Sequence, residues 1–131
     1  MATIRDFREL RCWQEARIVA KDVYKMTGQG LFAKDFGLRD QVQRAAVSIG
    51  SNIAEGFERD SNAELVKFLS YAKGSVGEVM SQLYTAFDVG YISQEDLDGM
   101  ELRLKTLGAS IASFQAVAKR SAVRGVMYKK S

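Results

Sequence analysis

The clearest structural pattern in this 131-residue chain is the stretch GLRDQVQRAAVSIGSNIAEGF, residues 37–57. Its apolar positions recur every three or four residues, at Leu38, Val42, Ala45, Ile49, Ile53 and then Gly56 or Phe57. That spacing places them on one face of an α-helix. The chain contains no proline, so nothing removes a backbone donor from a helix interior. We therefore predict an amphipathic helix that begins near residues 34–38 and ends near Phe57.

The same spacing predicts three further helices around this one. They cover about residues 7–27, 61–90 and 93–121. The helix that begins at Ser61 carries the pattern Ser-x-x-Glu, which ends at Glu64 and is typical of a capping box. Glycines mark the ends of the segments at residues 7–27 and 61–90, and glycine favours the end of a helix.

Four helices joined by short connections predict an all-α fold, an antiparallel four-helix bundle with up-down-up-down topology. No long window shows the alternating pattern of a β-strand. The length is typical of one domain, and 47% apolar with 27% charged residues is an ordinary globular balance. We expect the bundle to occupy residues 1–121 and a basic, flexible tail to occupy residues 122–131.

The sequence lacks most groups that support catalysis at neutral pH. It contains no histidine and one cysteine, Cys12, which falls on the apolar face of the first helix. Without histidine it has no Ser-His or Cys-His pair, no Glu-x-x-His metal motif and no zinc site of the cysteine–histidine type. We expect a non-enzymatic protein without metal or cofactor. No apolar run approaches the roughly 18 residues of a membrane span, and no signal-peptide pattern begins the chain, so we expect a cytoplasmic location.

Two rows of small residues lie outside the predicted core faces of the second and third helices. They are Ala46, Gly50 and Ala54 on the second helix and Ser70, Gly74, Gly77 and Ser81 on the third. Glycine inside a helix costs about 1 kcal/mol relative to alanine, whereas small residues let another backbone approach closely. The rows are either tolerated on a solvent face or make tight helix contacts, within the bundle or between subunits. We favour a contact between subunits, and hence a homo-oligomer.

A polar row follows one flank of the core face of the second helix. Its members are three or four residues apart and are Gln41, Arg44, Ser48, Asn52 and Glu55. Serine and asparagine are poor helix formers in a helix interior. Two roles fit the row, a hydrogen-bond network with a neighbouring helix or direct contact with a ligand.

Charge is distributed unevenly along the chain. The formal net charge is +3, but seven basic residues and no acidic residue follow Glu101, so the remainder carries +3 − 7 = −4. The candidate nucleic-acid-binding residues form a C-terminal basic arm, which consists of Lys119, Arg120, Arg124, Lys129 and Lys130. The alternative is a basic tail that only solubilises the helix end and complements its dipole.

Three sequence motifs occur in a distinctive order. They are Trp13-Gln14-x-Ala16, the stretch at residues 37–57 and Phe68-Leu69-x-x-Ala72-x-Gly74-Ser75-x-x-Glu78. From about Phe7 to Ala118 the chain resembles a bacterial four-helix-bundle family, the proteins encoded in intervening sequences of 23S ribosomal RNA genes. The family pattern carries proline where this chain has Ala33 and Gly50. Glycine at position 50 permits a bend that proline would impose.

The resemblance implies a four-helix bundle that assembles as a homopentamer. It also implies a distant similarity to the accessory proteins of diversity-generating retroelements, which are basic barrels that bind nucleic acid and a reverse transcriptase. Membership does not by itself imply a ribosomal function, because many members lie outside ribosomal RNA operons.

Two functional hypotheses follow from these observations. The first is a pentameric protein that binds RNA or DNA through basic surface, where phosphate contacts dominate the affinity. The second is a protein-interaction scaffold in which the oligomer presents one partner site several times without binding nucleic acid. Both hypotheses expect other copies of the chain as partners, and neither expects a membrane.

Overall fold

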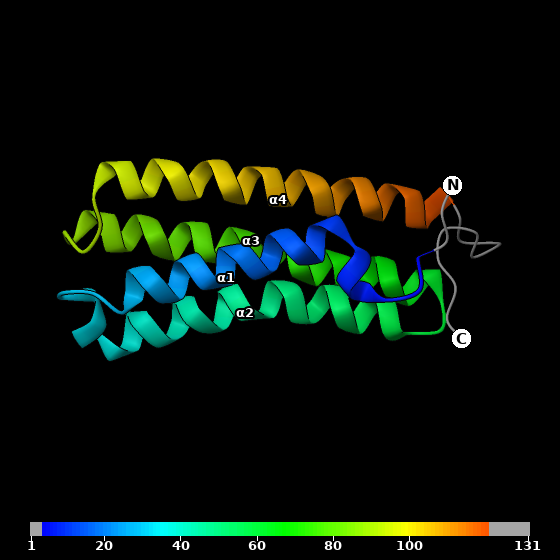
Figure 1. The fold of residues 1–131 in the computed structure, drawn as a ribbon, viewed down its shortest axis with the longest axis horizontal. Coiled ribbons are helices and arrows are strands. Elements are labelled where there is room, and N and C mark those ends of the chain that lie inside the picture. The colour runs from blue at the N-terminus through cyan, green and yellow to red at the C-terminus, as the bar shows by residue number, and fades with distance from the viewer. Residues whose placement is uncertain (1–3, 121–131) are drawn as a thin grey trace.

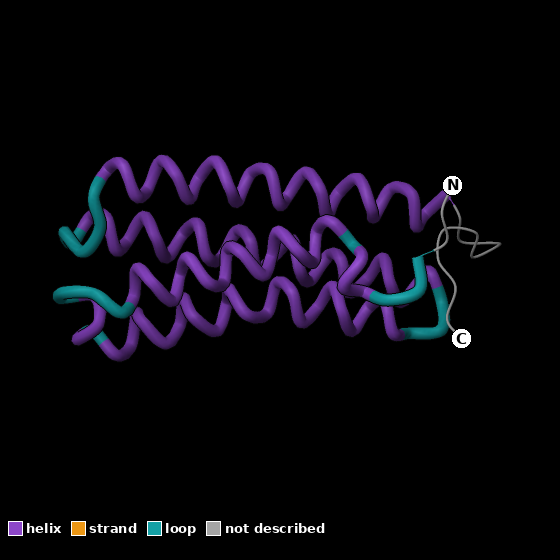
Figure 2. The backbone as a smooth tube through the Cα atoms, in the orientation of Figure 1, coloured by secondary structure: helices purple, strands orange, loops and turns teal. Residues whose placement is uncertain are grey.

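The computed structural model describes residues 4–120, and the regular elements within that range are all helical (Figures 1 and 2). The four long helices are α1 (Arg11–Thr27), α2 (Phe36–Glu58), α3 (Asn62–Asp88) and α4 (Gln94–Arg120). Successive helices run in opposite directions, and their connections lie at the two ends of the bundle (Figure 1). The predicted all-α fold with four helices is confirmed. Residues 121–131, which include the predicted tail, lie outside the described residues.

Side-chain caps explain where three of the long helices begin. The capping residues Asp35, Ser61 and Ser93 accept backbone hydrogen bonds from Leu38, Glu64 and Asp96 at 3.1, 3.1 and 3.0 Å. Each cap satisfies a backbone donor that the first turn of a helix leaves without an intrahelical partner. The cap at Ser61 agrees with the Ser-x-x-Glu pattern predicted for the start of α3, and Ser93 caps α4 in the same way.

The start of the first helix differs from the prediction. Phe7–Glu9 forms a short 3-10 helix, Leu10 is extended, and α1 begins only at Arg11. Asp6 explains the difference, because its Oδ1 accepts a hydrogen bond from Arg8 N at 2.8 Å and caps the short turn locally. The extended backbone at Leu10 turns the chain, and the Leu10 side chain is buried in the core.

All four helices bury an apolar stripe in one core, and the helix pairs α1–α2, α2–α3, α3–α4 and α1–α4 are all in contact. The fully buried side chains include Ile49, Ile53, Leu65, Leu69, Leu83, Leu104, Leu107 and Ile111. Leu38, Val76 and Phe114, which the apolar spacing places on core faces, are only half-buried. Next to the last two, Ser75 and Gln115 are buried instead. α2 remains one continuous helix through Gly50.

Hydrogen bonds from buried amides attach α4 to α3. Gln115 Nε2 donates to the Val66 carbonyl at 2.9 Å and to Ser70 Oγ at 2.8 Å. Asn62 Nδ2 donates to the Ala118 carbonyl at 3.2 Å, which satisfies an acceptor in the last turn of α4. A buried amide is stable only when it is hydrogen-bonded, so these contacts explain why polar residues occupy core positions.

The α1–α2 and α3–α4 connections lie at one end of the bundle, and α1 begins and α4 ends at the other (Figure 1). Tyr91 joins the two connections, because its hydroxyl donates to Asp35 Oδ2 at 2.9 Å and its ring lies 5.4 Å from that of Phe32. The hydrogen bond to the Asp35 carboxylate raises the pKa of Tyr91. Within residues 4–120, no helix combines the length and the apolarity that a bilayer crossing requires.

Candidate nucleic-acid interface

The predicted C-terminal basic arm is described only in part. Lys119 and Arg120 are exposed on the last turn of α4, and neither forms an ion pair with another described residue. The remaining candidates, Arg124, Lys129 and Lys130, lie outside the described residues. The structure therefore places two of the five predicted residues, at the end of the bundle where α1 begins (Figure 1).

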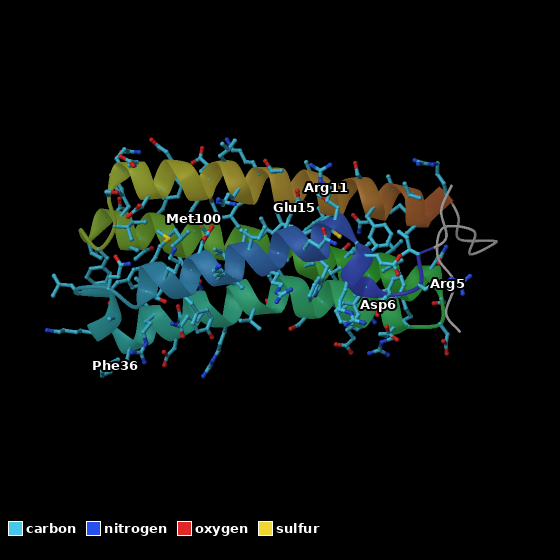
Figure 3. The ribbon with its side chains drawn as sticks, in the orientation of Figure 1. Arg5, Asp6, Arg11, Glu15, Phe36 and Met100 are labelled. Carbon is cyan, nitrogen blue, oxygen red and sulfur yellow. The ribbon has the colours of Figure 1, made fainter. Side chains whose placement is uncertain are left out.

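α1 carries a second group of cations that sequence analysis did not identify. Its two acidic residues are both neutralised, since Glu15 lies 3.4 Å from Arg11 and Asp22 lies 3.1 Å from Arg103 of α4. Figure 3 shows Arg11 and Glu15 together near the start of α1. Three basic residues of α1 then remain without an ion pair to any described residue. They are Arg17, Lys21 and Lys25, which we call the α1 basic row.

The α1 basic row follows the exposed side of its helix. All three side chains are exposed, and successive members are one helical step of four residues apart. A step of four residues corresponds to about 6 Å along a helix axis. The row therefore presents three positive charges in a line about 12 Å long.

A hollow of about 420 Å³ lies between α1 and α2, where Tyr24 is the α1 residue in its lining. It is lined by Tyr24, Asp40, Gln43, Arg44, Val47, Ser48 and Ser51. Tyr24 has half of its surface exposed, and Arg44 is exposed without an ion pair to a described residue. Asp40 pairs with Arg39 at 3.0 Å. The charged lining residue that has no ion pair to a described residue is therefore Arg44, which is positive.

A second hollow of about 300 Å³ continues along the same two helices toward the start of α1. It is lined by Phe7, Trp13, Ala16, Arg17, Ala20, Ala46, Val47, Gly50, Ser51 and Ala54. Val47 and Ser51 line both hollows, which therefore adjoin each other, and we call the two together the α1/α2 groove. The Arg17 guanidinium lies 5.8 Å from the Trp13 ring centre, a distance typical of a cation–π contact.

The small-residue row of α2 faces α1 of the same chain. Ala46 is completely buried. A Cβ atom at Gly50 would lie 3.5 Å from Trp13 Nε1 and 3.7 Å from Ala16 Cβ, which are ordinary contact distances. Ala54 is half-buried at the groove. Within this chain the row thus permits close packing of α2 on α1 and shapes the groove floor.

The small-residue row of α3 has different surroundings. A Cβ atom at Gly74 or Gly77 would meet nothing within 4 Å in the described chain. Ser70 accepts the hydrogen bond from Gln115, and Ser81 is exposed. Packing inside the bundle therefore does not require glycine at positions 74 and 77.

Gly77 lines an apolar groove of about 500 Å³ between α3 and α4. Its other lining residues are Val76, Met80, Tyr84, Glu101, Leu104, Lys105 and Gly108. The Tyr84 hydroxyl donates to Glu101 Oε1 at 2.6 Å across the groove mouth. That hydrogen bond raises the pKa of Tyr84 and lowers the pKa of Glu101.

The predicted polar row divides into an internal part and an external part. The Ser48 hydroxyl lies 2.6 Å from the Ser75 hydroxyl of α3, and Asn52 Nδ2 donates to the Ser48 carbonyl at 2.9 Å. Gln41 and Arg44 are exposed, and Glu55 pairs with Arg59 at 2.7 Å. Two members thus form part of a structural network with α3, whereas Arg44 belongs to the α1/α2 groove.

The described residues offer little for nucleophilic or metal chemistry. Cys12 is buried, and burial raises the pKa of its thiol to about 12. A thiol with that pKa is almost wholly protonated at neutral pH and is a weak nucleophile. Within residues 4–120 no three histidine, cysteine, aspartate or glutamate side chains gather as they would around a metal ion.

Comparison with known protein families assigns the chain to one of them. Residues 8–113 match the family described as 23S rRNA-intervening sequence protein. The chain belongs to this family. The match includes α1, α2, α3 and most of α4, so the resemblance seen in the sequence motifs is confirmed.

A solved structure in the same fold comes from Bacteroides thetaiotaomicron and is described as a protein of unknown function from the S23 ribosomal protein family. It is 21% identical to this member of the 23S rRNA-intervening sequence protein family, with a TM-score of 0.72. The alignment covers 79% of this chain and 97% of that chain. This likeness supports the shared fold. No curated protein matches the sequence significantly.

The two basic surfaces differ in their relation to the family match. The α1 basic row and Arg44 lie inside residues 8–113, whereas Lys119 and Arg120 lie beyond them. The signal for the row was present in the sequence as basic residues at every fourth position, opposite the apolar stripe of α1. The row was not predictable from the sequence alone, because Glu15 and Asp22 mask the excess charge until their ion pairs are known.

Proposed function

We propose that this family member is a non-enzymatic, self-assembled helical protein that binds nucleic acid through basic surface. The observation that carries the proposal is the α1 basic row. Both acidic residues of α1 are already in ion pairs, so the three exposed cations of the row have no ion pair to any described residue. Exposed lysine and arginine side chains without ion pairs are the groups that bind phosphates and release counterions.

Further support comes from the charge of the chain. The C-terminal basic arm adds five basic residues, of which Lys119 and Arg120 lie on the described end of α4. The family description also refers to an intervening sequence of 23S rRNA, which associates the family with an RNA gene. We propose that contacts are made to the sugar–phosphate backbone and show little preference for base sequence.

Self-assembly is the second part of the proposal. Gly74 and Gly77 cost helix stability, and within the described chain nothing packs against them. A close approach by another copy would explain both glycines, and a homopentamer is the form that the family resemblance implies. Repeating weak phosphate contacts on several subunits would raise the overall affinity without new contacts.

Fluorescence anisotropy with labelled RNA and DNA at several salt concentrations tests nucleic-acid binding. The expected result is binding at low salt that weakens linearly on a log–log plot as salt rises. A chain that ends after Ala118 lacks the basic arm but keeps the core of α4, and it separates the contribution of the arm from that of α1. If the full-length protein shows no binding at low salt, the nucleic-acid proposal is wrong.

A protein-interaction scaffold is the second candidate function. The α3/α4 groove favours it, because this groove is largely apolar and Tyr84 at its mouth is exposed. Exposed apolar surface of this kind is typical of protein contacts. Salt separates the two functions, since a contact made through an apolar groove should weaken much less with salt than phosphate binding does.

A further inference from the structure

We infer that the α1/α2 groove binds a single strand of nucleic acid, with phosphates along the α1 basic row and a base against Tyr24. This inference rests on the proposed nucleic-acid binding and assigns it a surface and a strand class. The residues that carry it are Arg17, Lys21, Tyr24, Lys25 and Arg44. None of them belongs to the C-terminal basic arm.

The charge around the groove favours a polyanion. The cations of the α1 basic row and Arg44 are exposed and make no ion pairs with described residues. Asp22 and Asp40 are occupied, since Asp22 pairs with Arg103 and Asp40 pairs with Arg39. Lys25 also lines a hollow on the α4 side of α1, together with Glu95 and Asp96. Arg17 and Arg44 line the groove itself, and Lys21 and Lys25 continue the positive charge along the exposed side of α1, where a strand of phosphates can neutralise it.

The hollow at Tyr24 provides a place for a base. Its volume of about 420 Å³ falls within the roughly 300–1,000 Å³ of small-molecule pockets. Tyr24 is 51% exposed, so part of its ring surface is open to a ligand. Positively charged grooves that follow a backbone, combined with aromatic rings that stack on bases, are the usual design for single strands.

Polar groups in the hollow complete the site without imposing one base. Gln43 Nε2 donates to Thr27 Oγ1 at 2.8 Å, so the Gln43 carbonyl oxygen remains an acceptor. Ser51 adds an exposed hydroxyl, which both donates and accepts. Groups of this kind fit several base edges, so we expect weak sequence preference.

The dimensions of the groove favour a single strand over a duplex. The α1 basic row is about 12 Å long. A typical duplex-binding domain contacts about 16 base pairs of RNA, which is a much longer stretch than this row can follow. The bases of a duplex are stacked inside and would have to flip out before one could reach Tyr24. A single strand presents its bases without that cost.

The test measures anisotropy of a labelled single-stranded 12-nucleotide RNA and of a hairpin duplex of the same length. One variant combines Arg17→Gln, Lys21→Gln and Lys25→Gln. Its matched control combines Lys67→Gln, Lys73→Gln and Lys105→Gln, which removes the same charge from exposed positions on α3 and α4. Circular dichroism checks that both variants keep the helical fold.

We expect the α1 variant to bind the single strand at least tenfold more weakly at low salt and its control to lose less than twofold. The log–log salt slope should fall by up to about 2 in the α1 variant, because each lost contact to a single strand contributes about 0.7. Tyr24→Ala should weaken single-strand binding roughly tenfold and leave duplex binding unchanged. Tyr24→Phe keeps the ring and should bind like the wild type, and Tyr71→Ala serves as an exposed tyrosine control on α3.

The outcomes separate this inference from the proposed function. If the wild type binds but the α1 variant and its control lose affinity equally, the groove assignment is wrong while nucleic-acid binding stands. If the duplex binds more tightly than the single strand, the strand class is wrong. If the wild type binds neither RNA at low salt, both the proposed function and this inference fail.

Discussion

At the scale of single residues, glycines in similar helical positions have opposite surroundings. A Cβ atom at Gly56 would lie 2.8 Å from Phe68 Cβ, closer than real Cβ atoms approach another atom, and 3.2 Å from Leu65 Cδ1, which is a tight contact. We expect Gly56→Ala to lower the free energy of unfolding by about 1–3 kcal/mol, because α2 and α3 must move apart. Urea unfolding followed by circular dichroism measures the change.

Gly77 supplies the control for that substitution. A Cβ atom there would meet nothing within 4 Å of the described chain, so Gly77→Ala should not strain the bundle. Its better helix propensity should raise stability by up to about 1 kcal/mol when the chain is dilute. If Gly56→Ala proves as harmless as Gly77→Ala, the close approach of α2 and α3 at Gly56 is wrong.

The burial of the Cys12 thiol predicts that the stability of the fold depends on pH in the alkaline range. Burial raises the pKa of its thiol to about 12 from an ordinary value of 9.0. The unfolded chain therefore releases the thiol proton at lower pH than the folded chain does. The contribution of Cys12 to stability should be complete below about pH 9 and should decline as the pH rises toward 12. Urea unfolding at several pH values measures this slope.

The variant Cys12→Ala isolates the thiol from other groups that titrate in the same range. Its stability should fall less steeply above pH 9 than that of the wild type. A thiol reagent at pH 8 should label the folded wild type slowly and the urea-unfolded chain rapidly. Equal slopes for the two proteins, or rapid labelling of the folded chain, would contradict the burial of Cys12.

At the scale of elements, the buried Gln115 amide makes two of the hydrogen bonds that attach α4 to α3. Gln115 Nε2 bonds to the Val66 carbonyl and to Ser70 Oγ near the C-terminal end of α4. We expect Gln115→Ala to lower the free energy of unfolding by about 1–3 kcal/mol through lost hydrogen bonds and lost packing. Amide hydrogen exchange should accelerate in the last turns of α4 before it does in α1 or α2.

The matched control is Gln41→Ala, because Gln41 is exposed on α2. It should change stability by less than about 0.5 kcal/mol and leave the exchange of α4 unaltered. Uniform acceleration of exchange over all four helices in the Gln115 variant would show that α4 is not attached locally by this residue.

The helices themselves were predictable, because apolar spacing and serine caps are properties of short sequence windows. The boundaries of α2, α3 and α4 agree with the prediction within a few residues. The start of α1 was not predictable from apolar spacing, since the Asp6 cap and the extended Leu10 interrupt a pattern that otherwise continues to Phe7. Gln115 was also missed, because a polar residue is assigned to the core only when its partner on another helix is known.

The candidate site was less predictable than the fold, because it depends on contacts between helices. The α1 basic row becomes visible only when Asp22 is paired with Arg103 of α4. The small-residue rows looked alike in the sequence, yet Gly50 faces Trp13 of its own chain while Gly74 and Gly77 face open space. Periodicity gives the face of a helix, whereas tertiary packing decides what lies against that face.

At the scale of the whole molecule, we predict a homo-oligomer, most simply a pentamer. Light scattering at micromolar concentration should give a mass near five times the 14.6 kDa chain. The double variant Gly74→Leu with Gly77→Leu should keep its helical signal and lose the oligomer, since a Cβ atom at either position meets nothing within the described chain, whereas leucine side chains would clash with a close neighbour. A wild-type mass of 14.6 kDa, or a variant with unchanged mass, would contradict this assembly.

The even number of antiparallel helices has a consequence for the order in which they are connected. Because α1 begins and α4 ends at the same end of the bundle, a short glycine–serine linker between residues 4 and 120 should close the backbone into a ring (Figure 1). New ends can then be opened between Gly28 and Gln29, both exposed in the α1–α2 connection. Such a circular permutant, in which α2 comes first and α1 last, should regain the same helical content and unfold cooperatively in urea. Failure to fold would show that the bundle depends on α1 being made before α2, and not only on the contacts between the finished helices.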